Sequence, residues 1–411
     1  MDKIFYQQNR AKLLEKVDGD GLILLFGSSA LYKNANGYYG KTLDMNFFYM
    51  TGLKTSSSIL AMWNENGKIC ERLFIEKPDP DEEKWSGIRM TSSQASNISG
   101  VEDIAYLREF DSFLSTISAS PVGKTLNLDI PVWFEEDVPA PIDSFVRRMR
   151  NSHPDIIFNS IGDIIADMRI VKRPGEIECI RKAVVNTRAG IEEMLTAVRP
   201  GMYEYQLQAV CYNLLYERGE MKAAPMVASG ANAVILHYSE SDAIIQEEDL
   251  VLIDFCPSSN YYAADISRAF PASGRFSHRQ RELYKVALDA NKRMIDVVEP
   301  GMSFQKMNEL ARQFLGDGML AIGLISSRDE VKTYYYHGVS HYMGLMIHDV
   351  GNTDLPIPEN AVLTLDAGVY VAEEGIGLRV EDDVLITSSG CENLSDSIIK
   401  EIEDIEMFMA G

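Results

Sequence analysis

The sequence predicts a mixed α/β (α+β) protein with an N-terminal domain, residues 1–165, followed by a second domain, residues 166–411. Three observations predict this class. Strand-like apolar runs alternate with segments of helical periodicity. The character of the chain changes between residues 150 and 175. Finally, one order of elements occurs twice in the second domain, which indicates a duplicated α/β half and a pseudo-twofold arrangement.

The first domain reads as a mixture of helices and strands. Residues 8–17 have helical periodicity, whereas residues 21–26 form an apolar run typical of a buried strand. Residues 47–51 and 58–63 are predicted as further strands. The polar, proline-containing stretch 77–84 is expected to be a solvated loop.

The second domain contains the repeated order. Amphipathic helices expected over about residues 176–197 and 279–298 each end at a Pro-Gly-Met stop, at residues 200–202 and 300–302. Another helix follows each stop, and an apolar strand that ends in aspartate comes after it. One such helix stop is common, but two in matching units predict that the functional site lies where the two halves meet.

Composition excludes several classes of function. Lys and Arg total 39 against 61 Asp and Glu, so the 411-residue chain carries a formal charge of −22. Nucleic acid and anionic membranes need a basic surface, so neither is an expected partner. The polar N-terminus lacks the apolar region of a secretory signal. The five cysteines are scattered without a CxxC, which argues against disulfides or a thiolate metal site and favours the cytoplasm.

Two pairs of carboxylates carry the predicted chemistry. Asp254 and Asp265 flank a turn-like centre between Ser259 and Asn260, so they would face each other across a hairpin. Asp366 and Glu381 would face each other in the same way in the second half. A single pair has an ordinary explanation, an aspartate that caps a turn. Two symmetric pairs of buried like charges instead require protonation, a cationic partner or a metal.

Histidines add a further kind of ligand. Three of the six lie in the run 337–349, between the carboxylates of the second half and those of the first. The spacing is not HExxH, and Gly338 argues against one continuous helix, so a thermolysin-type zinc site is not expected. Four carboxylates and one imidazole favour Mn²⁺, Co²⁺ or Fe²⁺, and zinc less specifically. Two divalent ions would balance the four carboxylates and a bridging hydroxide would serve as nucleophile, which predicts a two-metal hydrolase.

Several stretches resemble the aminopeptidase P and prolidase family, metallopeptidase family M24, which has the pita-bread fold. The resemblance spans about residues 5–409 and is closest to Xaa-Pro aminopeptidase. Its most specific stretches are Ile235 to Tyr238, Asp254 with Ala264 to Phe270, His337 to Gly351, and Gly375 to Asp383. Residues 47–52 and 85–87 look like the N-terminal domain of aminopeptidase P, which methionine aminopeptidases lack.

The resemblance implies roles for individual residues. The implied ligands of two divalent ions, with Mn²⁺ expected and Co²⁺, Zn²⁺ or Fe²⁺ as alternatives, are Asp254, Asp265, His341, Asp366 and Glu381. Asp265 and Glu381 would bridge the ions. The residues implied in catalysis are His237, His348 and Asp366, the last as proton acceptor. Those implied in substrate binding are His337, Tyr370, Arg379 and Trp85. The substrate would be a peptide with proline in second position, and a homodimer or homotetramer is implied.

The chain departs from the family pattern at three places. Asp366-Ala367-Gly368 stands where the family usually has Glu-Pro-Gly, and Asp254-Phe255-Cys256 where it usually has Asp-Ala-Gly. The stretch near Asn36 lacks an aspartate that could meet the substrate amine. Three alternatives stay open: a prolidase restricted to Xaa-Pro dipeptides, a metal-free hydrolase similar to creatinase, and a degenerate peptide-binding homologue without catalysis.

Overall fold

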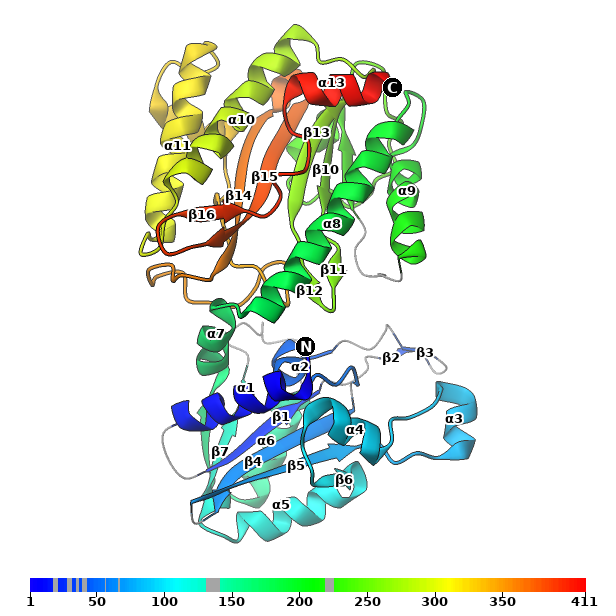
Figure 1. Ribbon diagram of the computed structural model, residues 1–411, viewed down its shortest axis with the longest axis vertical. Helices are drawn as coiled ribbons and strands as arrows, with labels where there is room; N and C mark the ends of the chain where they lie inside the picture. Colours follow the sequence, from blue (N-terminus) through cyan, green and yellow to red (C-terminus); the bar gives the residue numbers. More distant parts are fainter. Residues whose placement is uncertain are drawn as a thin grey trace. The chain divides into compact units, whose positions relative to one another are not determined.

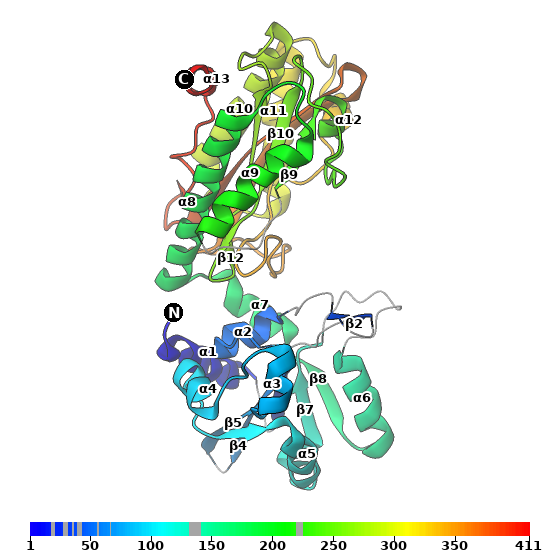
Figure 2. The same ribbon diagram turned by 90° about the vertical axis from the view of Figure 1, so that its right-hand side faces the viewer.

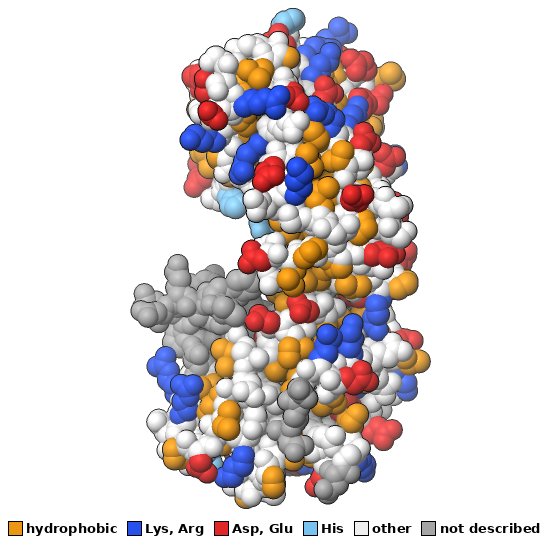
Figure 3. Space-filling view, turned by 90° about the vertical axis from the view of Figure 1, so that its left-hand side faces the viewer, with side chains coloured by type: hydrophobic (Ala, Val, Ile, Leu, Met, Phe, Trp, Pro, Cys, Tyr) orange, Lys and Arg blue, Asp and Glu red, His pale blue; other side chains and the backbone are white. Residues whose placement is uncertain are grey.

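The computed structural model of the chain is mixed α/β, as predicted (Figure 1). It describes residues 1–411 except 18–20, 28–31, 35–36, 39–42, 56, 66, 131–140 and 219–224. The residues form two compact units, Met1–Met168 and Arg169–Gly411. Among the described residues, no helix combines the length and apolar character that crossing a membrane requires. Acidic and basic side chains are interspersed over the face drawn in Figure 3.

The N-terminal unit is built on a six-stranded mixed sheet of order β6-β5-β4-β1-β7-β8. Its strands are β1 (Leu22–Phe26), β4 (Ser58–Glu65), β5 (Lys68–Ile75), β6 (Ile104–Tyr106), β7 (Thr125–Leu128) and β8 (Ile157–Ser160). β1 pairs antiparallel with β4 and parallel with β7, which places it at the centre of the sheet. A separate short hairpin comprises β2 (Tyr32–Asn34) and β3 (Gly37–Tyr38).

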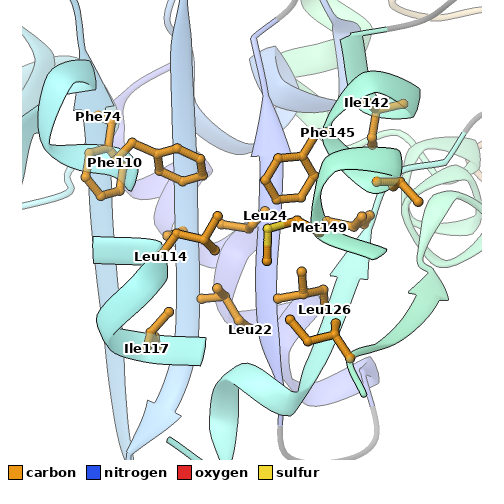
Figure 4. Close-up of a cluster of buried hydrophobic side chains, with 14 residues drawn as sticks. Leu22, Leu24, Phe74, Phe110, Leu114, Ile117, Leu126, Ile142, Phe145 and Met149 are labelled. Carbon is orange, nitrogen blue, oxygen red and sulfur yellow. The ribbon is translucent and has the colours of Figure 1, made fainter. Parts of the chain in front are cut away.

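The core of this unit lies between the sheet and two helices, α5 (Phe110–Ser118) and α6 (Pro141–Ser152) (Figure 4). Aromatic rings from the strands and both helices meet there, so burial of apolar area holds the helices on the sheet. The remaining helices are α1 (Lys3–Lys16), α2 (Met45–Thr51), α3 (Pro80–Ser86), α4 (Ser92–Ser99) and α7 (Gly162–Ile170), whose last two residues belong to the second unit. The buried guanidinium of Arg10 donates to the carbonyls of Met50 and Ser99, at the ends of α2 and α4.

Two local predictions for this unit were wrong. Residues 47–51, predicted as a strand, belong to α2, where Asp44 caps the Phe47 N–H at 2.7 Å and Gly52 ends the helix at φ 71°. All five residues are buried, so the helix shows no polar face by which sequence could distinguish it from a strand. The stretch 77–84 is exposed as predicted, but α3 begins within it because Asp79 caps the Asp81 N–H.

The second unit contains the predicted duplication. Helices α8 (Pro174–Ala197) and α9 (Glu204–Glu217) form one pair, and α10 (His278–Val297) and α11 (Phe304–Ala321) form the other. Gly201 and Gly301, which follow the end of the first helix of each pair by four residues, both have φ 89°, a conformation that favours glycine. Their N–H groups donate hydrogen bonds of 2.8 Å to the carbonyls of Ile245 and Ile357, respectively. The two halves therefore repeat hydrogen bonds as well as the order of elements. Figure 2 shows α9 beside α8, where the Cys211 thiol contacts the Gly190 carbonyl at 3.6 Å.

Each half contributes a three-stranded sheet. The first has the order β13-β10-β9 and the second β14-β15-β16. Their strands are β9 (Met226–Ser229), β10 (Leu250–Phe255), β13 (Ile266–Pro271), β14 (Val362–Val371), β15 (Ile376–Ile386) and β16 (Cys391–Asn393). β13 and β15 lie side by side (Figure 1), and the Arg268 guanidinium on β13 donates to the Glu381 carbonyl at 2.6 Å. The remaining elements are β11 (Ser258–Ser259), β12 (Tyr262–Ala263), α12 (Val331–Tyr334) and α13 (Ile402–Ala410).

Candidate metal centre

The first carboxylate hairpin forms, but its register differs from the prediction. The turn is centred on Asn260 and Tyr261, whose φ values of 48° and 72° are those of a two-residue hairpin turn. As a result Asp254 lies opposite Ser267, and the prediction that it lies directly opposite Asp265 was wrong by two residues. A shift of two residues keeps a side chain on the same face of the sheet, so Asp254 and Asp265 are diagonal neighbours on one face.

The same register places Cys256 opposite Asp265. Phe255 pairs with Ile266 on one side of this position, and Ser258 pairs with Ala263 on the other. The Cys256 Sγ atom lies 2.9 Å from Asp265 Oδ1 and 3.3 Å from Asp254 Oδ1. The thiol is therefore part of the cluster that contains the two aspartates.

The second hairpin has the predicted register. Asp366 on β14 pairs directly with Glu381 on β15, and Gly375 turns the chain at φ 64° after the short 3₁₀ segment Ala372–Glu374. The two hairpins are joined through Ser267, whose hydroxyl donates to Glu381 Oε2 at 2.8 Å. The contact of β13 with β15 thus brings the acidic residues of both halves to one place.

We call Asp254, Asp265, Asp366 and Glu381 the carboxylate cluster. Burial, and then the charges of the other three members, raise the pKa of Glu381 well above its ordinary value. Burial and the neighbouring Asp265 raise the pKa of Asp254 to about 7, although the Arg379 guanidinium contacts it at 2.7 Å. For these two acids burial and like charge outweigh the neutralising groups nearby, whereas the burial of Asp265 is outweighed by its contact with His341, so that its pKa is lowered.

The histidines predicted for the site lie around this cluster. His341 Nε2 is 3.2 Å from Asp265 Oδ2, while its Nδ1 is 3.1 Å from the Tyr342 carbonyl, which requires Nδ1 to carry a proton. The rings of His341 and His348 stack at 4.0 Å. Burial and the charges of His341 and His237 lower the pKa of His348, which places exposed His237 in its electrostatic neighbourhood.

The donor set fits divalent cations. Two groups place potential ligand atoms within 4.8 Å of one another: Asp265 with His341 and His348, and Asp254 with Cys256 and Asp265. Asp366 Oδ1 is buried and has no hydrogen-bond partner in the described part of the chain. Carboxylate oxygens with one or two imidazoles are ligands of Mn²⁺, Co²⁺, Fe²⁺ or Zn²⁺. Such ions would neutralise the excess charge and bind the unsatisfied oxygen.

The residues predicted to bind substrate are divided between the two units. His337 Nε2 is 2.7 Å from the Tyr370 hydroxyl, and its Nδ1 is 3.5 Å from Asp366 Oδ2. Arg379, which pairs with Asp254, also contacts the Leu236 carbonyl at 3.2 Å. Trp85 lies in α3 of the N-terminal unit with 93% of its surface exposed, and its role stays a prediction. Asn36 itself lies outside the described residues.

Three residues in or beside the cluster were not predicted. Cys256 could have been found from its spacing of two residues from Asp254, and the register on both sides of it places it across from Asp265. Ser267 joins the hairpins but has no distinctive sequence signal. Asp383 follows Glu381 by two residues, so strand periodicity places it on the same face. Its Oδ2 accepts the Asp265 N–H at 3.2 Å and so fixes the backbone that carries this aspartate.

Comparison with known proteins agrees with this architecture. The family model of metallopeptidase family M24 matches residues 178–388, and that of the aminopeptidase P N-terminal domain matches residues 6–124. Xaa-Pro aminopeptidase of Haemophilus influenzae is 28% identical over 98% of this chain and 96% of its own length. Xaa-Pro aminopeptidase of Escherichia coli is also 28% identical, over 99% of this chain and 97% of its own.

Solved structures resemble the chain over its whole length. A Bacillus anthracis protein provisionally identified as aminopeptidase P has a TM-score of 0.97 and 37% identity, covering 100% of this chain and 99% of that one. A variant of Escherichia coli aminopeptidase P in complex with substrate has a TM-score of 0.90 and 27% identity, covering 100% and 98%. The predicted pita-bread fold is thus confirmed, and the chain belongs to metallopeptidase family M24.

Proposed function

We propose that this protein is an Xaa-Pro aminopeptidase, a hydrolase that removes the first residue from peptides with proline in second position. The observation that carries the proposal is the carboxylate cluster. Four acids from two duplicated hairpins converge there, Asp265 and Glu381 among them buried, and His341 contacts Asp265. Relatives that bear the name Xaa-Pro aminopeptidase match both the N-terminal and the catalytic domain, and nearly the whole chain. We propose residues 1–165 and 166–411 as the two functional domains.

We further propose that the cluster holds two divalent metal ions, with Mn²⁺ as the expected metal. The proposed ligands are Asp254, Asp265, His341, Asp366 and Glu381. Oxygen donors dominate this set, which favours manganese over softer ions. Bound divalent ions would supply Lewis-acid polarisation of the scissile carbonyl and a more acidic attacking water. Among the solved structures that resemble the chain is a zinc-substituted form of Escherichia coli aminopeptidase P in complex with product.

The remaining residues would bind the substrate and move protons. The bond before proline is a tertiary amide without an N–H, so recognition depends on the shape of the pocket, which we assign to His337, Tyr370 and Arg379. His237 and His348 would donate hydrogen bonds to the substrate carbonyl oxygen as negative charge develops on it. Asp366 would accept a proton from the attacking water, and the departing prolyl nitrogen must receive one.

Assembly and location belong to the same proposal. We propose a homodimer or homotetramer in which Trp85 of one copy borders the substrate pocket of another, since this large apolar side chain is 93% exposed in α3. Proline-containing peptides are the proposed partners, and the cytoplasm is the proposed compartment, in agreement with five free cysteines.

The test measures metal content and peptide cleavage on one preparation. Chelator-treated protein should be inactive and should regain Xaa-Pro-Xaa cleavage with Mn²⁺. Asp265→Ala and His341→Ala should both abolish this recovery because each removes a proposed ligand. His278→Ala is the matched control, since this histidine side chain is 91% exposed in the same unit and should leave activity unchanged. Activity that chelators do not affect would contradict the two-metal mechanism.

The same assay separates the alternatives. Cleavage of Xaa-Pro dipeptides without cleavage of Xaa-Pro-Xaa would identify a prolidase. Fewer than one firmly bound divalent ion per chain, together with no Mn²⁺-dependent cleavage, would identify a non-catalytic peptide-binding homologue.

A further inference from the structure

The position of Cys256 has a chemical consequence beyond the proposed ligand set. Its Sγ lies 2.9 Å from Asp265 Oδ1 and 3.3 Å from Asp254 Oδ1, and these three donor atoms lie within 4.8 Å of one another. Both neighbours are carboxylates of the cluster, so the sulfur lies among the oxygens that are proposed to hold the ions.

These contacts differ from those of other cysteines in the same unit. The Cys211 thiol donates to the Gly190 carbonyl, and the Cys391 thiol donates to the Ile295 carbonyl at 3.3 Å. Such contacts are ordinary for a buried structural thiol. Cys256, in contrast, has two carboxylate neighbours.

A thiol cannot satisfy two carboxylates at once. It has a single proton, so it can donate to one carboxylate, and its sulfur lone pairs then face the other. When both acids are ionised, the arrangement leaves one sulfur–oxygen contact repulsive. A cation that binds to the sulfur and to both oxygens removes the repulsion, which a second hydrogen bond from this thiol cannot do.

We propose that Cys256 is a sulfur ligand of the metal centre and that it shifts the preference of the centre toward zinc or cobalt relative to manganese. The inference rests on the proposed function. When the ion binds, the S–H bond breaks, the proton passes to solvent, and a sulfur lone pair forms the bond to the ion. No electron is transferred. Thiolate is a softer ligand than carboxylate and binds Zn²⁺ and Co²⁺ more strongly than Mn²⁺.

The first experiment measures the absorption spectrum of metal-free protein titrated with Co²⁺. Wild-type protein should show the visible ligand-field bands of bound cobalt and also a near-ultraviolet sulfur-to-cobalt charge-transfer band. Cys256→Ser and Cys256→Ala should keep the ligand-field bands and lose the charge-transfer band. Cys70→Ser is the matched control, because Cys70 lies on β5 in the N-terminal unit, and it should retain both features.

The second experiment measures metal selectivity by competition. Cys256→Ser should lower the ratio of Zn²⁺ to Mn²⁺ affinity on the order of tenfold, whereas Cys70→Ser should leave the ratio unchanged. In wild-type protein, bound Zn²⁺ should lower the rate of Cys256 alkylation by about tenfold or more relative to the metal-free protein. This measurement does not depend on whether the variants fold.

The outcomes distinguish this inference from the proposed function. Ligand-field bands without a charge-transfer band in the wild type would overturn the sulfur ligand and leave the metal centre standing. A charge-transfer band that persists in Cys256→Ser would also overturn it. No cobalt binding at all would overturn both proposals, and unprotected alkylation in the zinc-loaded protein would overturn the sulfur ligand alone.

Discussion

Glu381 and Asp382 are neighbours on β15, both are buried, and they have opposite electrostatic surroundings. Because successive side chains of a strand point to opposite faces, the two acids lie on different sides of the sheet. Asp382 is 2.7 Å from the Arg268 guanidinium and also pairs with the Lys400 ammonium. Glu381 instead accepts a hydrogen bond from Ser267 and lies among three other carboxylates.

The pKa values follow this difference. Burial opposes ionisation of Asp382, but Arg268 and Lys400 outweigh it and lower its pKa to about 2. On the other face, burial and like charges act in the same direction on Glu381 and raise its pKa well above the ordinary value. The buried Asp382 is thus neutralised by two cationic side chains of the chain, Arg268 and Lys400. On the other face Arg379 pairs with Asp254 and His341 contacts Asp265, but Glu381 has no ion pair among the described residues. We propose that bound ions supply the missing positive charge there.

The largest expected effect is that of Glu381→Gln on catalysis. This change keeps the shape of the side chain but removes a proposed bridging carboxylate, so kcat/KM for an Xaa-Pro-Xaa peptide should fall on the order of 100-fold or more. The metal-free variant should be at least as stable to denaturant as metal-free wild type, because it lacks an acid whose ionisation is opposed by burial and by like charges. A variant with wild-type kcat/KM would contradict the proposed ligand role.

Asp382→Asn should have the opposite profile. Removal of this charge leaves Arg268 and Lys400 buried without their counter-ion, and breaking such a buried pair costs about 3–5 kcal/mol of unfolding free energy. Chemical denaturation of the metal-free variant measures this loss. If Asp382→Asn loses less stability than Glu381→Gln, the assignment of the two faces is reversed.

The cluster could be predicted from sequence because an error of two residues in strand register leaves each side chain on the same face of the sheet. The long hairpin around Gly375 was placed correctly, and Asp366 pairs with Glu381. The shorter hairpin could turn at residues 259–260 or 260–261, and the difference changes each partner by two positions. Asp265 stays on the same face under this shift, so the acids converge even though the predicted register was wrong.

Other parts of the site could not be predicted, because they depend on exact strand register or on partners that are distant in sequence. Strand periodicity places Cys256 on the face of Asp254, but its position across from Asp265 requires the exact register, which the prediction missed. The run Glu381-Asp382-Asp383 looks like one acidic stretch, and its division depends on Arg268 and Lys400, which are distant in sequence. Residues 47–51 were misassigned because a helix buried on all sides lacks the periodicity that identifies it.

The pH dependence of stability, measured with and without metal, tests the difference between the two faces of β15. The pKa of Asp254 is raised from 3.8 to about 7 in the metal-free fold. Protonation of this acid therefore stabilises the fold fully below pH 3.8, and this contribution is lost as the pH rises through 7. Mn²⁺ at about 100 times its Kd should add about 2.7 kcal/mol of stability where the ligands are ionised. Thermal unfolding with and without Mn²⁺ should therefore show a larger shift in Tm above pH 7 than near pH 5.

Asp382 provides the internal control for that experiment. Its lowered pKa means that its contribution is present above 3.8 and is lost only as pH falls toward 2. The destabilisation caused by Asp382→Asn should thus be the same near pH 5 and above pH 7. A loss that changes between these conditions would show that the two faces do not titrate independently.

The smallest expected effect is that of Asp366→Glu, which tests whether the length of the side chain at position 366 limits its contact with bound ions. Asp366 lies opposite Glu381, and its Oδ1 is buried without a hydrogen-bond partner among the described residues. One additional methylene extends the carboxylate by about 1.5 Å. If the shorter side chain limits contact with the ions, Mn²⁺ affinity should rise by less than about tenfold. The stability of the metal-free protein should change by no more than about 0.5 kcal/mol.

Asp366→Asn is the matched control because it keeps the length of the side chain and removes its charge. It should weaken Mn²⁺ binding, whereas Asp366→Glu strengthens it, so the pair separates reach from charge. A fall in affinity for both variants would mean that the centre is fitted to the shorter carboxylate. The sulfur of Cys256, on the opposite hairpin, would then be the next place to look for the compensating contact, and a double variant with Cys256→Ala would measure the coupling directly.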